Sequence, residues 1–177
     1  EIAFMDEQIG RLSKWLKANG LGEKTIIVLV GDHGEGLGEH GELAHGYFIY
    51  DYAVHVPLII STPDKRFQGK RVSLEVSTVD IFPTVAELAG LEARTSQGRS
   101  LVQIMAGRKE KEIPAYCESM SPSLHYGWSP LLGLRTSQFK FIDAPRPELY
   151  DLKNDPEENT DVQNKFPQVG LNYKKDL

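Results

Sequence analysis

The residues best suited to chemistry lie together in the glycine-rich run 31–41. Asp32 and His33 stand near its start, further Glu and His residues follow, and glycine recurs at positions 34, 36, 38 and 41. Because glycine lets the backbone bend freely, a carboxylate and an imidazole can converge there on one point. An Asp oxygen and a neutral His nitrogen together suit Zn²⁺, Mn²⁺ or a similar divalent ion. The alternative is a turn whose Asp caps a backbone N–H; the density of Gly, His and Glu favours the metal.

The run follows directly on the apolar stretch Thr25–Val30, which is short and rich in β-branched residues. This composition predicts a parallel strand buried on both faces, and ligands in open α/β sheets gather beyond the carboxyl ends of such strands. An amphipathic helix is predicted upstream, ending at Asn19-Gly20, because apolar residues recur there at spacings of three and four. These residues are Ile2, Met5, Ile9, Leu12 and Leu16. Helix, short loop and strand predict an α/β fold.

Beyond the run, two more strands and a helix are predicted. Val54–Ile60 is apolar enough for a strand, and 72–76 alternates as a half-exposed strand should. Ser77 or Thr78 is a candidate N-cap for a helix that ends at Gly90. The later strands have no helices between them, which favours an antiparallel sheet. These strands are 115–118, 131–136, 139–142 and 148–152.

The chain divides into three segments by composition. Residues 1–107 are expected to form part of a main α/β domain, and a charged link at 108–112 marks the boundary to a small antiparallel subdomain at 108–160. Residues 161–177 form a polar tail. The sequence from Asn154 onward is polar and acidic and contains two prolines, which predicts partial disorder.

Composition and charge exclude some classes of partner. The 177 residues carry a net charge of -5 at pH 7, which gives no reason to expect nucleic acid or an anionic membrane as partner. No apolar run approaches the roughly 20 residues of a membrane span. The single cysteine, Cys117, excludes an internal disulfide and a Cys-based zinc cluster, and its expected role is that of a small apolar residue in a strand.

The chain opens on Glu1, without an initiator Met and inside a helix-like pattern, so we expect a piece of a longer protein. Any targeting signal would lie upstream, which leaves localisation open and compatible with a periplasmic or other extracytoplasmic parent. Loss of the upstream part would uncover apolar sheet surface, and this predicts self-association.

Several stretches resemble the sulfatases, a family of the alkaline phosphatase superfamily. Four ordered matches over roughly residues 1–160 are more specific than any one of them alone. The stretches are Gly31–Gly41, Val56–Ile60, Ser77–Leu91 and Glu148–Glu158. The resemblance implies a mainly parallel sheet flanked by helices, with a small C-terminal antiparallel sheet.

The resemblance also implies a chemistry. In this family a formylglycine hydrate, made from the Cys or Ser of a Cys/Ser-x-Pro-x-Arg motif, attacks a sulfate ester beside one divalent metal ion. By that resemblance Asp32 and His33 are metal ligands, and Ca²⁺ is the ion expected first, with Zn²⁺ and Mn²⁺ as alternatives. Such an ion lowers the pKa of the nucleophile and neutralises charge on the transferred group.

His45 lies twelve residues beyond His33, where relatives with this loop often carry a Lys or His that contacts the sulfate. A histidine there can donate a hydrogen bond to the anion or protonate the leaving oxygen, which makes His45 the candidate catalytic residue. The alternative is a loop histidine that packs on Tyr47. His40 is expected to hold the loop, and His55 to be a surface strand residue.

The chain also departs from the family pattern. It contains no Cys/Ser-x-Pro-x-Arg motif, since Cys117 is followed by Glu118 and Ser119, and the paired upstream carboxylates of the metal site are absent as well. We therefore expect the C-terminal part of a sulfatase, with half a metal site, that is inactive alone. The formylglycine is expected in the missing upstream part.

Two other functions stay open. An Asp-His pair also occurs in superfamily relatives that cleave phosphate mono- or diesters or phosphonates, so the substrate is a sulfate ester or, alternatively, a phosphate-type ester. From a different class, the chain could be a non-catalytic interaction module whose loop histidines hold a structural Zn²⁺ or no metal. Three aromatic residues are candidates for lining the cleft, although the last two are expected rather to pack on the main sheet: Tyr47, Tyr126 and Trp128.

Overall fold

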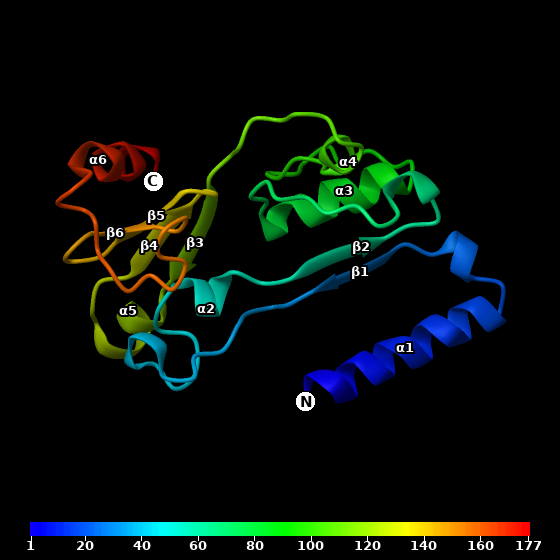
Figure 1. Ribbon diagram of the computed structural model, residues 1–177, viewed down its shortest axis with the longest axis horizontal. Coiled ribbons are helices and arrows are strands. Elements are labelled where there is room, and N and C mark those ends of the chain that lie inside the picture. Colours follow the sequence, from blue (N-terminus) through cyan, green and yellow to red (C-terminus); the bar gives the residue numbers. More distant parts are fainter.

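The computed structural model describes all residues from 1 to 177 and has two parts that lie side by side (Figure 1). One part holds a two-stranded sheet with helices α1, α3 and α4, and the other a four-stranded sheet with α2, α5 and α6. The helices are α1 (Ile2–Ala18), α2 (Asp51–Val54), α3 (Ile81–Leu88), α4 (Val102–Met105), α5 (Ser121–Tyr126) and α6 (Pro167–Asp176). The strands are β1 (Ile27–Val30), β2 (Leu58–Ser61), β3 (Ala115–Ser119), β4 (Leu131–Arg135), β5 (Phe139–Asp143) and β6 (Glu148–Asp151). No helix combines the length and the apolar character that crossing a bilayer requires.

Helix α1 forms where the apolar spacing predicts it and ends at Asn19, after which Gly20 takes a positive φ of 69°. Glycine adopts this left-handed conformation without a steric penalty, and the conformation stops the helix. None of the helix residues is buried. On the apolar face, Ile2, Met5 and Leu12 are 84%, 56% and 55% exposed, whereas Ile9 and Leu16 are half-buried. Most of the apolar face of α1 is thus uncovered within this chain. Self-association through such surface stays a prediction.

Strand β1 leads into the candidate site, and its only partner is β2 (Figure 1). The two strands run antiparallel, with Val28 opposite Ile60 and Val30 opposite Leu58. The prediction of a parallel strand buried on both faces is therefore wrong within this chain, where β1 is half-buried and ends on an exposed Val30. An apolar, β-branched run predicts strand formation and burial, but it does not specify the direction of the neighbouring strand.

Helix α3 begins as the sequence predicts. Ser77 and Asp80 form a capping box, in which the Asp80 carboxylate accepts the backbone N–H of Ser77 at 3.0 Å. Its other oxygen accepts the N–H of Arg99 at 2.8 Å, which ties the segment before α4 to the start of α3. The strand expected at 72–76 does not form, because an alternating pattern still needs a hydrogen-bonding partner and no strand pairs with these residues.

The C-terminal sheet is an antiparallel meander in the order β3-β4-β5-β6, as predicted. Its core packs Ile142 and Tyr150 against Ile49, which comes from the loop before α2. Gly133 in β4 allows this close approach, because a Cβ there would lie 2.9 Å from both the Cδ1 of Ile49 and the Sγ of Cys117. The mixed α/β class and the small C-terminal antiparallel sheet are confirmed.

The C-terminal segment is folded, so the prediction of partial disorder is wrong. Glu158 is 2% exposed and pairs with Lys140 of β5. Helix α6, with Pro167 in its first turn, packs against β5. The polar composition predicted disorder because charged residues are usually solvated. In the structure, however, one of these carboxylates, that of Glu158, lies in a buried ion pair. The division of the chain at residues 107 and 160 stays a prediction.

Candidate active site

The glycine-rich run follows β1 and starts a loop, residues 31–50, that leads to α2. The run contacts both α2 and a later part of this loop. The N–H of Gly34 donates to the carbonyl of Ala53 at 2.8 Å, and the N–H of Gly36 donates to the carbonyl of Ala44 at 2.8 Å. A Cβ on Gly34 would lie 1.7 Å from the carbonyl oxygen of Tyr52, so only glycine fits at this position. The contact of Gly34 thus holds the start of the loop against α2, and the bond from Gly36 to Ala44 holds it beside the later part of the loop.

Asp32 and His33 stand at the start of this loop with their side chains facing each other. Nδ1 of His33 donates to the carbonyl of Gly34 at 2.8 Å, and Nε2, the nitrogen left for another partner, lies 3.7 Å from Oδ2 of Asp32. The backbone N–H of His33 donates to Oδ1 of Asp32 at 3.0 Å, and this bond lowers the pKa of the carboxyl group. Asp32 is thus an ionised, solvent-exposed carboxylate.

Asp32 and His33 could supply two ligands to a divalent cation, but two ligands do not make a complete metal site. The carboxylate oxygen of Asp32 and Nε2 of His33 face each other at 3.7 Å, and both are atoms that ligate divalent ions when the imidazole is neutral. One ion at the usual ~2.0–2.5 Å from each of them would satisfy both. No third His, Cys, Asp or Glu joins them in a cluster. The chain by itself therefore offers an open, two-ligand site.

His45 lies next to the pair. Its ring stacks on that of His33 with 3.7 Å between the ring centroids, and its Nδ1 lies 3.2 Å from both carboxylate oxygens of Glu35. The following residue, Gly46, has a φ of 105°, and its carbonyl accepts the hydroxyl of Ser119 in β3 at 2.8 Å. The ring of His45 therefore packs on His33 and not on Tyr47, and its Nε2 is free of protein partners.

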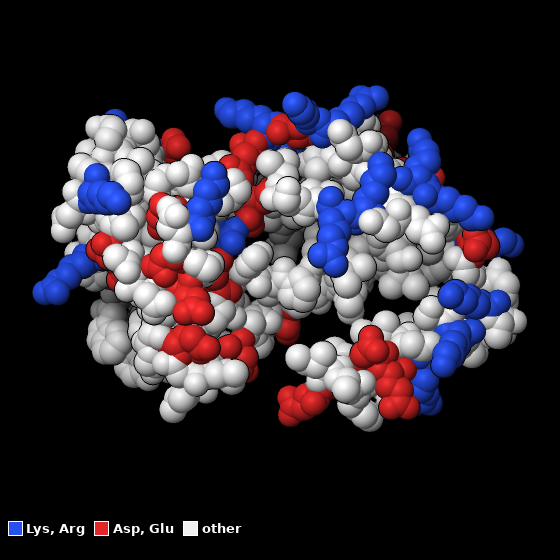
Figure 2. Space-filling view, viewed as in Figure 1, with Lys and Arg blue, Asp and Glu red and all other residues white.

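The three predicted residues line one cleft of about 480 Å³, whose other walls include β3 and Arg135. Figure 2 shows acidic side chains gathered over the loop and the turn after β6, whereas Lys and Arg gather over α3, α4 and the C-terminal end of α1. Acidic surroundings favour a cation over an anion at the loop. Cys117 also lines the cleft; burial raises the pKa of its thiol to about 11, so it behaves as the small apolar residue expected.

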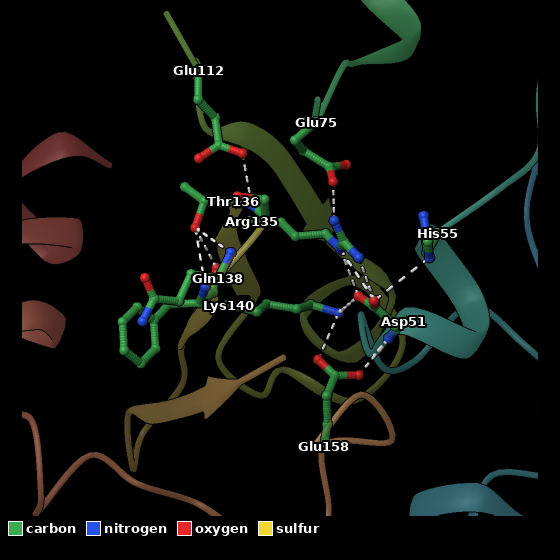
Figure 3. A network of polar contacts seen from close by, with 11 residues as sticks. Asp51, His55, Glu75, Glu112, Arg135, Thr136, Gln138, Lys140 and Glu158 are labelled. Atoms are coloured by element: carbon green, nitrogen blue, oxygen red, sulfur yellow. Dashed lines mark hydrogen bonds and ion pairs between the residues drawn. The ribbon is translucent and has the colours of Figure 1, made fainter. Parts of the chain in front are cut away.

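A buried ion network that the sequence analysis missed adjoins the cleft (Figure 3). Asp51 accepts hydrogen bonds from Arg135 at 2.8–3.1 Å and from Nζ of Lys140 at 3.0 Å. Lys140, which is fully buried, also pairs with Glu158 at 2.9 Å, and Arg135 pairs with Glu75. Burial by itself raises the pKa of Asp51, but Arg135 and Lys140 outweigh burial and lower it. At Glu158 burial prevails over Lys140, and the pKa is raised.

Two further histidines have structural contacts. His40 stacks on Tyr50 at 3.7 Å, and its Nε2 lies 3.2 Å from the carbonyl oxygen of Glu157, so it holds the loop as expected. His55 follows α2 and lies 3.7 Å from Asp51, so the expectation of a strand residue is wrong. No local signal points to the ion network, because its partners come from distant parts of the chain, with 84 positions between Asp51 and Arg135 and 107 between Asp51 and Glu158.

Two of the aromatic candidates, Tyr126 and Trp128, lie at the end of α5 and just beyond it. Their rings stack with centroids 4.9 Å apart, and the two residues are 54% and 65% exposed. The expectation that they pack on the main sheet is therefore wrong.

Comparison with known proteins agrees with this fold and loop. A family model described as Sulfatase matches residues 1–91, and the chain belongs to the sulfatase family. The chain is 34% identical to arylsulfatase K of Gallus gallus, an alignment that covers 99% of this chain and 34% of that protein. It is 30% identical to the delta 4,5-hexuronate-2-O-sulfatase of Bacteroides thetaiotaomicron, covering 90% of this chain and 34% of that protein. The chain thus spans about a third of the length of the curated relatives it matches.

Solved structures show the same likeness. The phosphonate monoester hydrolase of Agrobacterium radiobacter superposes with a TM-score of 0.84 at 30% identity, over 99% of this chain and 38% of that one. BT4656 in complex with its substrate D-glucosamine-2-N,6-O-disulfate superposes with a TM-score of 0.78 at 29% identity, over 98% and 37%. These findings confirm the alkaline-phosphatase-like α/β fold that the resemblance implied. The roles of Asp32, His33 and His45 stay predictions.

Proposed function

We propose that the chain is the C-terminal part of a metal-dependent sulfuric ester hydrolase, in which Asp32 and His33 bind a divalent ion and His45 acts on the ester. Membership of the sulfatase family supports the class of reaction. One observation carries the site: the carboxylate of Asp32 and Nε2 of His33 face each other at 3.7 Å, with the ring of His45 stacked on that of His33. A structural zinc site built from the loop histidines is disfavoured, because His40 stacks on Tyr50 instead.

Ca²⁺ is the proposed ion, with Zn²⁺ and Mn²⁺ as alternatives. Once bound, it would supply positive charge for the sulfate oxygens and lower the pKa of the attacking hydroxyl. The chain prepares the ligands through its backbone. The carbonyl of Gly34 sets the tautomer of His33, and the N–H of His33 keeps Asp32 ionised.

His45 is proposed to donate a hydrogen bond to the sulfate group or to protonate the leaving oxygen. The carboxylate of Glu35 accepts the Nδ1 proton of His45 and thereby orients the ring. Donation from Nε2 requires a second proton on the ring, so the proposed step starts from the imidazolium form of His45. The step leaves the neutral ring, with its Nδ1 proton held by Glu35, once the leaving oxygen has taken the Nε2 proton. Stacking on His33 keeps the ring beside the proposed metal ligands.

The nucleophile is proposed to be a formylglycine in an upstream part of the parent protein. The 177 residues contain no Cys/Ser-x-Pro-x-Arg motif, and they span about a third of the matched relatives. The chain alone is therefore expected to hydrolyse no sulfate ester.

The test uses the parent protein with single substitutions. Asp32→Asn and His33→Ala are expected to weaken Ca²⁺ binding in calorimetry and to lower kcat for a sulfate ester by roughly 100-fold or more. His45→Ala should lower kcat by roughly 10²–10⁴-fold with Ca²⁺ affinity unchanged. His125→Ala is the matched control, because His125 lies on α5 and its ring bonds to Ser121. Full activity of the Asp32 variant, or turnover by the 177-residue chain alone, contradicts the proposal.

A second candidate substrate has one specific observation in its favour. The superposition with a phosphonate monoester hydrolase, at a TM-score of 0.84 and 30% identity, is as good as that with the sulfatases. The parent would then cleave a phosphonate or phosphate ester. Measuring kcat/KM for sulfate, phosphate and phosphonate esters of one alcohol decides between them, and a preference for phosphorus of roughly tenfold or more favours the second candidate.

A further inference from the structure

Helix α2 contacts the loop that carries the predicted metal ligands. Its backbone carbonyl at Ala53 accepts the N–H of Gly34 at 2.8 Å, and a Cβ on Gly34 would lie 1.7 Å from the carbonyl oxygen of Tyr52. The hydrogen bond opposes separation of the two segments, and the close approach prevents them from coming nearer. A shift of α2 toward the loop or away from it would therefore also move Gly34.

The carbonyl of Gly34 is in turn the group that orients His33. It accepts the Nδ1 proton of the imidazole at 2.8 Å, so its position constrains both the orientation of the ring and the tautomer in which Nε2 faces Asp32. Such a hydrogen bond commonly orients a metal-binding histidine, and its loss costs about 10- to 100-fold in metal affinity. The position of α2 therefore bears on a predicted metal ligand.

Helix α2 cannot hold this position by itself. It comprises only the four residues Asp51–Val54, and no side chain caps its start. A single turn is unstable in isolation, because forming it fixes several dihedral angles for one hydrogen bond. Ala53 is buried, and Ile49 before the helix packs into the core of the C-terminal sheet, but apolar contacts have no preferred direction. Directional contacts are needed to fix the helix in one place.

Asp51, the first residue of α2, makes such directional contacts (Figure 3). Its backbone N–H donates to Glu158 at 2.5 Å. Its side chain, which is 14% exposed, accepts hydrogen bonds from Arg135 at 2.8–3.1 Å and from Lys140 at 3.0 Å. These partners come from β4, β5 and the segment after β6, so a movement of Asp51 would break at least one charge-assisted hydrogen bond. The first turn of α2 is thereby fixed.

Stability alone does not account for this arrangement of charges. Charges that are buried together lose their hydration, and replacing such a network by apolar residues of similar volume is often neutral or stabilising. An ion network differs from an apolar contact because its hydrogen bonds are directional and fix one geometry. Here the network acts on the helix that contacts the loop, which is where a fixed geometry affects the site.

We propose that Asp51 is a positioning residue for His33, acting through α2 and the carbonyl of Gly34. Its charged partners in the C-terminal part of the chain hold Asp51, and Asp51 holds the helix against the loop. The effect on the imidazole stands on these contacts alone. The effect on metal binding rests on the proposed function.

The first readout is the imidazole of His33 in the metal-free parent protein. Asp51→Ala removes the anchoring carboxylate, yet Arg135 keeps Glu75 and Lys140 keeps Glu158 as partners. In ¹⁵N NMR at about pH 8.5, where histidine side chains are ordinarily neutral, His33 of the unaltered parent is expected as the Nδ1–H tautomer. The variant should show a mixture of both tautomers. His33→Ala identifies the signal.

The second readout is Ca²⁺ affinity, measured by calorimetry. It is expected to fall roughly 10- to 100-fold in Asp51→Ala. The fall should be smaller in Asp51→Asn, because the amide oxygen still accepts a hydrogen bond. Asp143→Ala is the matched control and should change neither readout, since Asp143 is a carboxylate of β5 that pairs with Lys174 of α6 at 2.8 Å and is not part of the network.

The outcomes separate this inference from the proposed function. A tautomer shift confined to the Asp51 variants supports the positioning role, and if the parent binds no Ca²⁺ and hydrolyses no ester, only the hydrolase is contradicted. An unchanged tautomer and Ca²⁺ affinity in Asp51→Ala, with ester hydrolysis by the parent, overturn the inference and leave the hydrolase intact. An equal shift in Asp143→Ala overturns it as well. If circular dichroism shows Asp51→Ala to be unfolded, Asp51→Asn, which keeps the volume of the side chain, decides by the same two readouts.

Discussion

Replacing Lys140 tests the buried network that joins the loop to the C-terminal sheet. Its ammonium group is fully buried, 3.0 Å from Oδ1 of Asp51 and 2.9 Å from Oε1 of Glu158. Lys140→Met keeps most of the volume but leaves the buried Glu158 without its counter-ion, while Asp51 retains Arg135. Removing one partner of a buried ion pair costs about 3–5 kcal/mol. We expect the free energy of unfolding to fall by that amount near neutral pH.

The loss should depend on pH through Glu158. Burial already raises the pKa of this carboxyl above 4.5, and Lys140 opposes the rise, so removing Lys140 raises the pKa further. A group whose folded pKa is raised contributes stability below its unfolded pKa and loses it as the pH rises through the folded pKa. In the variant the protonated fraction of Glu158 grows as the pH falls, and the protonated, uncharged form needs no counter-ion. The loss should therefore be smaller at about pH 5 than at about pH 7.5.

The assay is a double-mutant cycle in the parent protein, with urea unfolding followed by circular dichroism. Lys140→Met combined with Glu158→Gln should recover about 1–3 kcal/mol relative to Lys140→Met alone, because the neutral amide leaves no unpaired charge. Lys153→Met is the matched control, since Lys153 is exposed. A loss below about 1 kcal/mol, strict additivity or a loss independent of pH would refute the reasoning.

Two further predictions concern the loop and the thiol. Gly34→Ala is expected to lower Ca²⁺ affinity and kcat roughly tenfold or more, because the new Cβ would clash with the carbonyl oxygen of Tyr52. Gly10→Ala is the control and should change neither quantity, because no atom lies within 4 Å of its Cβ. Equal effects of the two substitutions would contradict the argument. Cys117 should react with iodoacetamide at about pH 8 roughly 100-fold more slowly in the folded than in the urea-unfolded protein. The reason is that burial raises the pKa of its thiol to about 11 in the folded protein, from the ordinary value of 9.0. Timed alkylation with peptide mass mapping measures both rates.

The elements with strong local signals could be predicted from the sequence. Helix α1 follows from its apolar spacing, α3 from the capping box of Ser77 and Asp80, and the C-terminal strands from short apolar runs without intervening helices. The pairing of strands depends on residues far apart in the sequence, and it was predicted less well. The apolar run of β1 does not encode the antiparallel direction of β2, and the alternation at 72–76 does not provide a partner strand.

The same distinction applies to the candidate site. Asp32 and His33 are adjacent in the chain, so a local motif is enough to predict that they face each other. The glycines indicate a folded loop, but the stack of His45 on His33 and its contact with Glu35 depend on the backbone turns between them. The ion network gives no local signal at all, because a single charged residue on a strand or in a polar tail is usually solvated.

The C-terminal part of the chain belongs to the framework of the candidate site, because residues 46–51 contact it at three points. The carbonyl of Gly46 accepts a hydrogen bond from Ser119 of β3, the side chain of Ile49 packs into the core of the sheet, and the N–H of Asp51 donates to Glu158 at 2.5 Å. His45 directly precedes the first of these points. Because His45 stacks on His33 from this anchored part of the chain, we expect a substitution that breaks the buried ion network also to disturb the stack of the two rings.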